Sequence, residues 1–103
     1  MGLDMNSLMR QAQKMQEKMQ QVQAELANER LEHSSGGGMV KCIVNGQGEV
    51  LSISIEPEAL SEGSEMLEDM VLVAVREAIN KAAALQQERM SGLTGGMNIP
   101  GLF

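Results

Sequence analysis

The sequence combines 103 residues and a formal net charge of −6 with one cysteine, one histidine and one aromatic residue, Phe103. The length suits one domain with a modest core, and the residue counts exclude an intrachain disulfide, a Cys/His zinc site and the aromatic stacking surface of single-strand nucleic-acid binders. Because neither a signal peptide nor a membrane-length apolar run is present, we expect a cytoplasmic protein with no membrane partner, cofactor or metal.

A long amphipathic helix is predicted for about residues 4–30, with Asp4 or Asn6 as its N-terminal cap. Its apolar residues alternate between spacings of three and four, which places them in one stripe. They are Met5, Leu8, Ala12, Met15, Met19, Val22 and Leu26. The stripe predicts core packing or a coiled-coil seam, and a groove for a peptide or a membrane surface is the alternative.

A row of basic residues follows the same helix. Arg10, Lys14 and Lys18 repeat every fourth residue, so they share one face of the helix. Neighbouring like charges at this spacing destabilise an isolated helix, and Glu17 offsets only part of the repulsion. The row is therefore either a solvated helix face or a contact surface for an anionic ligand.

A small antiparallel sheet is predicted next, with strands at about residues 31–35, 39–45 and 49–56. The first strand ends in the glycine run 36–38. Apolar and polar residues alternate in the other two strands, and Asn45-Gly46 offers hairpin-turn chemistry between them. This alternation gives the sheet one apolar face, covered on one side. Pro57 ends the last strand because it cannot donate a ladder hydrogen bond.

A second long helix is predicted for about residues 64–90, after one helical turn at 57–60. Ser64 can cap it, and Gly92 follows its end. One apolar stripe holds Leu67, Val71, Ala74, Ala78, Ala82 and Leu85, and an adjoining stripe holds Leu72, Val75, Ile79 and Met90. A face this wide predicts contact with both its own sheet and a partner protomer. Residues 1–91 are thus expected to form one domain, followed by a flexible glycine-rich tail at 92–103.

The sequence contains no pattern typical of an enzyme. Acidic pairs such as Glu56 and Glu58 suit a turn or a helix N-terminus, where the helix dipole favours negative charge. Cys42 lies on the buried side of a predicted strand with no base assigned to it. The glycine run 36–38 precedes a strand and lacks the Gly-Lys-Ser/Thr of a phosphate loop. We therefore predict a protein without catalytic activity or a small-molecule substrate.

Six segments carry a family resemblance: 8–19, 38–41, 44–46, 55–57, 65–71 and 96–101. The first opens with Leu-Met-x-Gln-Ala-Gln-x-Met-Gln, and the fifth contains Met-Leu-Glu-Asp. Through these segments the chain resembles the YbaB/EbfC family of bacterial nucleoid-associated proteins over its full length. The resemblance implies an α+β fold, an α-β-β-β-α protomer with a small antiparallel sheet between two long helices, and a tweezer-like homodimer. It also implies binding of double-stranded DNA with broad or weak sequence preference, in gene regulation or nucleoid organisation.

Charge suggests which residues would contact DNA. Residues 31–70 carry one base and eight acids, whereas 1–30 are neutral overall, so we expect the long helices to supply the contacts. The candidates are Arg10, Lys14, Lys18, Lys81 and Arg89 for phosphates, with Gln11 and Gln13 for hydrogen bonds. We expect the first helix to pack at its C-terminal half and to project at its N-terminal half. The alternative function is a dimeric helical clamp for a peptide or protein, with only incidental DNA binding.

Overall fold

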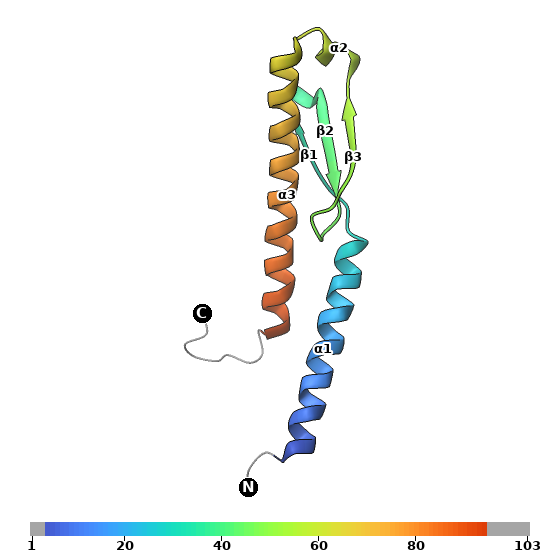
Figure 1. Cartoon of the computed structure of the whole chain (residues 1–103), viewed down its shortest axis with the longest axis vertical. Coiled ribbons are helices and arrows are strands. Elements are labelled where there is room, and N and C mark those ends of the chain that lie inside the picture. The colour runs from blue at the N-terminus through green and yellow to red at the C-terminus, as the bar shows by residue number, and fades with distance from the viewer. Residues whose placement is uncertain (1–3, 95–103) are drawn as a thin grey trace, which may run out of the picture.

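The N-terminal helix, α1, spans Met5–Ala27 and projects from one end of the molecule (Figure 1). The structure is a computed structural model that describes residues 4–94. Asp4 caps α1, since its carboxylate accepts a hydrogen bond of 2.6 Å from the N–H of Ser7. A carboxylate at this position also interacts favourably with the positive end of the helix dipole. The cap therefore fixes where the projecting helix begins.

Three antiparallel strands follow α1 and form one sheet in the order β1-β2-β3. β1 spans Leu31–Ser35, β2 spans Val40–Val44 and β3 spans Val50–Ile55. One 3-10 turn, η1 at Gly36–Gly38, joins the first two strands. All three of its glycines have positive φ, a conformation that residues with side chains rarely adopt. The glycine run thus serves as a strand connection.

Two helices complete the described part of the chain. α2 is a single turn at Pro57–Leu60, and α3 spans Ser64–Thr94. α3 continues through Gly92, past the domain boundary expected at residue 91. Residues 95–103, the remainder of the expected tail, lie outside the described residues. The element order confirms the predicted α+β, α-β-β-β-α protomer.

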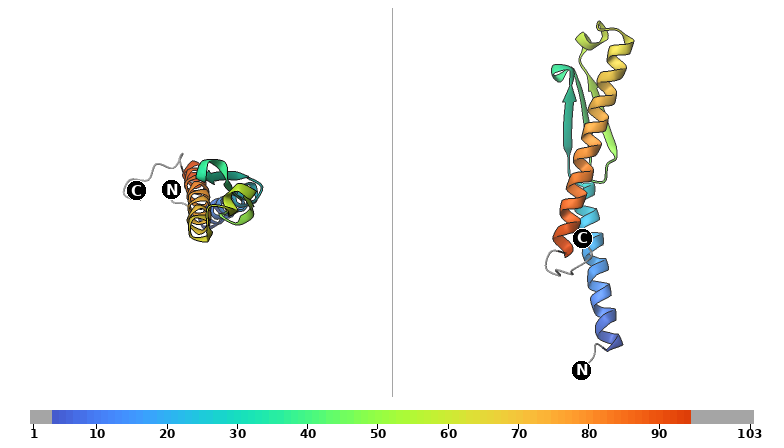
Figure 2. Two further views of the ribbon diagram at one scale, coloured as in Figure 1. Left: turned by 90° about the horizontal axis from the view of Figure 1, so that it is seen from above. Right: turned by 90° about the vertical axis from the view of Figure 1, so that its left-hand side faces the viewer.

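The core lies between α3 and the first two strands (Figures 1 and 2). α3 runs along one face of the sheet and contacts β1 and β2. The fully buried side chains at this contact are Val40, Cys42 and Val44 from β2 and Ala74, Ala78 and Ala82 from α3. The alternation predicted for the second strand is confirmed, and the small alanine side chains let the helix backbone approach the sheet closely.

The apolar row of β3 remains open, although its sequence pattern predicts a covered face. Ile53 pairs with Cys42 and Ile55 pairs with Val40, so both lie on the face that α3 covers. They are nevertheless 44% and 42% exposed. A helix about 10 Å wide covers roughly two strands spaced about 4.8 Å apart, and α3 lies over β1 and β2. The third strand therefore presents an uncovered apolar edge beside α3.

Candidate nucleic-acid interface

The projecting half of α1, residues 5–18, carries three exposed bases on one face. Arg10, Lys14 and Lys18 follow one another at intervals of four residues, which is about 6 Å along a helix. Within residues 4–94, none of the three forms a salt bridge with a carboxylate. Their positive charges are therefore available to an anionic ligand.

A shallow groove runs beside these bases. It has a volume of about 310 Å³ and is lined by Gln11, Lys14, Met15 and Lys18. The structure thus brings Gln11 together with two of the predicted cationic contacts. Gln13 is exposed but does not line the groove, since it lies about 100° from Lys14 around the helix. An anionic group in the groove would face two ammonium groups and one amide donor.

Lys81 lies on α3, in the body of the molecule and apart from the α1 bases. Its ammonium group donates a hydrogen bond of 2.8 Å to the backbone carbonyl of Glu32 in β1. The side chain remains exposed, so its charge faces solvent next to the sheet. A duplex bound along the projecting half of α1 would contact a different part of the surface.

Arg89, the other candidate on α3, is already paired with two carboxylates. Its Nη2 donates to Oε1 of Glu29 at 2.8 Å, and its Nη1 lies 3.8 Å from Oε2 of Glu25. The hydrogen bond to Glu29 raises the pKa of Arg89 above its usual value. Because Glu25 belongs to α1 and Glu29 follows just after its end, Arg89 links α3 to the C-terminal end of α1 instead of presenting an uncompensated charge.

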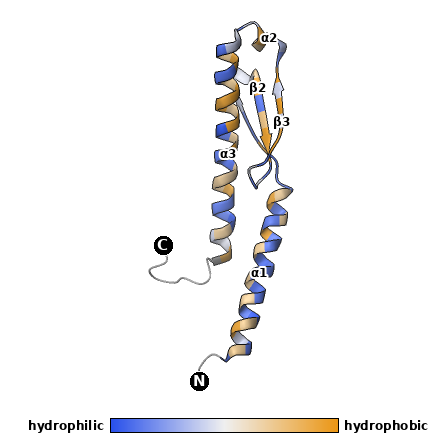
Figure 3. Cartoon of the chain, in the orientation of Figure 1, coloured by the Kyte–Doolittle hydropathy of each residue, from blue (hydrophilic) through white to orange (hydrophobic). Residues whose placement is uncertain are grey.

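The apolar stripe of α1 is covered only near its C-terminal end. Met5 is 72% exposed and Leu8 is 43% exposed, whereas Leu26 is completely buried. Met15 and Val22, between them, are half-buried. This gradient confirms that α1 packs at its C-terminal end and projects at its N-terminal end, and Figure 3 shows apolar and polar residues interleaved along the projecting part.

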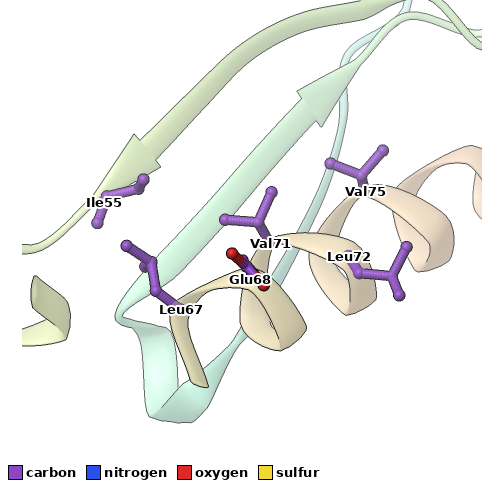
Figure 4. A pocket seen from close by; sticks show the side chains of 6 residues that line it. All are labelled: Ile55, Leu67, Glu68, Val71, Leu72 and Val75. Carbon is purple, nitrogen blue, oxygen red and sulfur yellow. The ribbon is translucent and has the colours of Figure 1, made fainter. Parts of the chain in front are cut away.

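A second and more apolar groove lies between α3 and the open edge of β3 (Figure 4). Its volume is about 500 Å³, and its lining comprises Ile55, Leu67, Glu68, Val71, Leu72 and Val75. Leu72 is 57% exposed and belongs to the wide apolar face of α3, which is predicted to contact both the sheet and a partner protomer. The sequence did not predict that β3 lines this groove, because the alternation of apolar and polar residues in β3 predicted that the protein's own helix covers it.

A family model shows to which proteins the chain is related. The model of the YbaB/EbfC DNA-binding family matches residues 1–97. The chain belongs to the YbaB/EbfC family. A nucleoid-associated protein of Pelotomaculum thermopropionicum is 50% identical over 104 residues, covering 100% of this chain and 99% of the relative. A nucleoid-associated protein of Caldanaerobacter subterraneus is 46% identical over 103 residues, covering 99% of this chain and 93% of the relative.

The fold also has a counterpart among solved structures. The crystal structure of an uncharacterized protein from Helicobacter pylori matches with a TM-score of 0.66 at 22% sequence identity. The match covers 75% of this chain and 90% of that one. At this level of identity the likeness concerns the fold alone.

This YbaB/EbfC protein separates its charges along its length. The end formed by α2 and the start of α3 carries six exposed carboxylates. They belong to Glu56, Glu58, Glu62, Glu65, Glu68 and Asp69. Between Lys41 and Arg76 the chain has no lysine or arginine. A polyanion would be repelled from that end and attracted to the projecting half of α1.

Other site chemistries find little support in this YbaB/EbfC chain. Cys42 is completely buried, and burial raises the pKa of its thiol, which makes it a poor nucleophile. Among residues 4–94, no group of three or more His, Cys, Asp or Glu side chains is arranged to hold a metal ion. No helix in the described part of the chain is long and apolar enough to cross a bilayer.

Sequence reasoning missed the carboxylates that engage Arg89. Glu25 and Glu29 are four residues apart, a spacing that places both on one face of the helix predicted for residues 4–30. That spacing was the available signal. Nothing in the sequence placed them beside a residue 60 positions further along the chain.

Proposed function

We propose that the protein is a nucleoid-associated protein that binds double-stranded DNA as a homodimer, with broad or weak sequence preference, in the bacterial cytoplasm. Membership of a DNA-binding family and the names of the relatives support this function. The observation that carries the choice of contact surface is the row Arg10, Lys14 and Lys18, which is exposed on the projecting half of α1 and forms no salt bridge with the residues that the structure describes.

Phosphate contacts explain why sequence preference would be weak. Lysine and arginine gain affinity for DNA by releasing counterions from phosphates, a term that is the same for every sequence. Base edges are read by side chains held in defined positions within a groove, and the exposed arm of α1 lacks a second element to hold its glutamines. Gln11 would therefore add hydrogen bonds without imposing a strict sequence requirement.

Uncovered apolar surface supports the homodimer. The groove between α3 and β3 is lined by five aliphatic side chains and one carboxylate. The exposed apolar row of β3 extends it along the sheet. Contiguous apolar surface of this kind marks an interface in a small soluble protein. A second copy covering this groove would join two bodies and leave two α1 arms free to contact one duplex.

A salt titration of duplex binding tests the α1 surface. If six phosphates are contacted by the two α1 rows of a dimer, the plot of log affinity against log salt concentration has a slope of about −5, at roughly 0.9 per phosphate. Replacing Arg10, Lys14 and Lys18 with Gln should flatten that slope while the dimer persists. Lys41→Gln removes an exposed base from the sheet instead, and we expect it to leave the slope unchanged.

Two results would contradict the proposal. An unchanged slope in the triple variant would exclude the α1 row as the phosphate contact. Duplex binding seen only well below about 150 mM salt would favour the alternative, a helical clamp in which the exposed stripe of α1 holds a peptide.

A further inference from the structure

The base of α1 is held by polar contacts from two other parts of the chain. From α3, Arg89 reaches Glu25 and Glu29. The turn between β2 and β3 adds two contacts: the N–H of Gly46 donates to the carbonyl of Leu26 at 2.7 Å, and the amide of Gln47 donates to the carbonyl of Gln23 at 3.1 Å. These contacts lie where the covered end of α1 gives way to its projecting half.

The turn itself is held between the two long helices. The carbonyl of Gly46 accepts a hydrogen bond of 2.8 Å from the side-chain amide of Gln86 on α3, while its N–H points to α1. A Cβ atom at Gly46 would lie 2.7 Å from the carbonyl oxygen of Leu26. Such a contact is too close for any side chain, so only glycine permits this approach. One glycine residue thereby connects the β2–β3 turn to both α1 and α3.

Arg89 joins α3 to the C-terminal end of α1 through two carboxylates. Glu25 lies in the last turn of α1 and Glu29 lies two residues beyond its end at Ala27, and different nitrogens of the guanidinium group contact them. A planar group held by one carboxylate on the last turn of a helix and one just after it restricts how that end of the helix can swing. The side chain of Arg89 is 34% exposed, so solvent screens the pairs only partly.

We propose that Arg89, together with Gln86 and Gly46, forms a clamp that sets the direction of the α1 arm. This inference rests on the proposed function, because the clamp would act on DNA through the arm. Arg89 is accordingly a positioning residue. It holds the exposed basic residues Arg10, Lys14 and Lys18 of α1 in place and does not itself contact phosphate. An arm already fixed in direction loses less conformational freedom when it binds, which favours affinity.

Arm direction can be measured without DNA. A spin-label pair at Gln13→Cys on α1 and Glu58→Cys on α2, with the buried Cys42 replaced by Ala, is mixed with an excess of unlabelled protein. A homodimer then carries at most one labelled chain, and the pair reports the distance between arm and body within that chain. We expect a narrow distance distribution in the parent protein, a broad one after Arg89→Gln, and a narrow one again in the charge-swapped protein. The swap combines Arg89→Glu and Glu29→Arg with Glu25→Gln, which removes the carboxylate that would otherwise repel the new one. Arg76→Gln is the matched control, since among residues 4–94 the only ion-pair partner of Arg76 is its neighbour Glu77 on the same helix.

Duplex binding separates positioning from direct contact. For a clamp, Arg89→Gln lowers affinity by roughly two- to tenfold while the salt slope stays the same, and the charge swap restores affinity. For a phosphate contact, the slope becomes shallower by about 0.9 for each phosphate lost, and a glutamate at position 89 cannot rescue binding.

The two proposals fail in different ways. An unchanged distance distribution in Arg89→Gln, or a shallower salt slope without rescue by the charge swap, would overturn the clamp. If the parent protein does not bind a duplex, the proposed function fails, whereas the spin-label distances still decide whether the clamp directs the arm.

Discussion

At the scale of single residues, the turn between β2 and β3 shows how a correct prediction can rest on a different cause. Asn45-Gly46 predicts a hairpin through the positive φ that such pairs adopt, and a hairpin is present. Positive φ occurs instead at Gly48, at +87°, while Gly46 is needed because Leu26 lies against it. Sequence indicates where a turn forms, but a close approach from another helix has no local signal.

Asn45 provides the first stability prediction. It is 4% exposed, and its Oδ1 accepts hydrogen bonds from the N–H groups of Gln47 and Glu49 at 2.9 and 3.0 Å. Asn45→Ala leaves both donors without this partner and should lower the free energy of unfolding by about 1–3 kcal/mol. Urea unfolding monitored by circular dichroism measures this free energy, because the chain has no Trp or Tyr for fluorescence. Ser52→Ala, at an exposed site on β3, should be nearly neutral. Equal effects of the two changes would show that the hydrogen bonds accepted by Asn45 do not stabilise the fold.

At the scale of elements, periodicity predicts which residues share a face but not what covers that face. The α1 stripe has the same spacing at Leu8 as at Leu26, yet the first is 43% exposed and the second is fully buried. Likewise the β3 pattern resembles that of β2, and only the placement of α3 over β1 and β2 leaves it open. Coverage depends on the path of α3 across the sheet, which the local pattern of either strand does not encode.

The alanine row of α3 allows a direct test of that packing. Ala78 is completely buried against the sheet, where a larger side chain has no space. Ala78→Leu should destabilise the protein by about 1–3 kcal/mol through overpacking. Ala84→Leu makes the same change at an exposed position of the same helix and should have little effect. If thermal unfolding monitored by circular dichroism shows similar shifts for both variants, α3 does not pack on the sheet through this row.

At the scale of the whole molecule, the opposite placement of charge and apolar surface links assembly to binding. The bases of α1 project from one end, whereas the apolar groove and the acidic cluster lie toward the other. A dimer joined through the groove would therefore keep its DNA-contacting arms clear of its own interface. Assembly would double the number of bases that face one duplex without changing either arm.

Leu72 tests this link between assembly and binding. It is 57% exposed at the groove, so a carboxylate there would be buried by a second copy at a high desolvation cost. We expect Leu72→Asp to reduce the mass measured by sedimentation equilibrium from twice 11.1 kDa to that of one chain. The salt slope for duplex binding should then become shallower, from about −5 to about −3, because one α1 row contacts half as many phosphates.

Leu60→Asp is the control for this variant: it places the same charge at an exposed site on α2 and should preserve both the mass and the slope. A Leu72→Asp protein that stays dimeric would exclude the groove as the interface, and a monomer that keeps the steeper slope would show that one chain alone makes all the phosphate contacts.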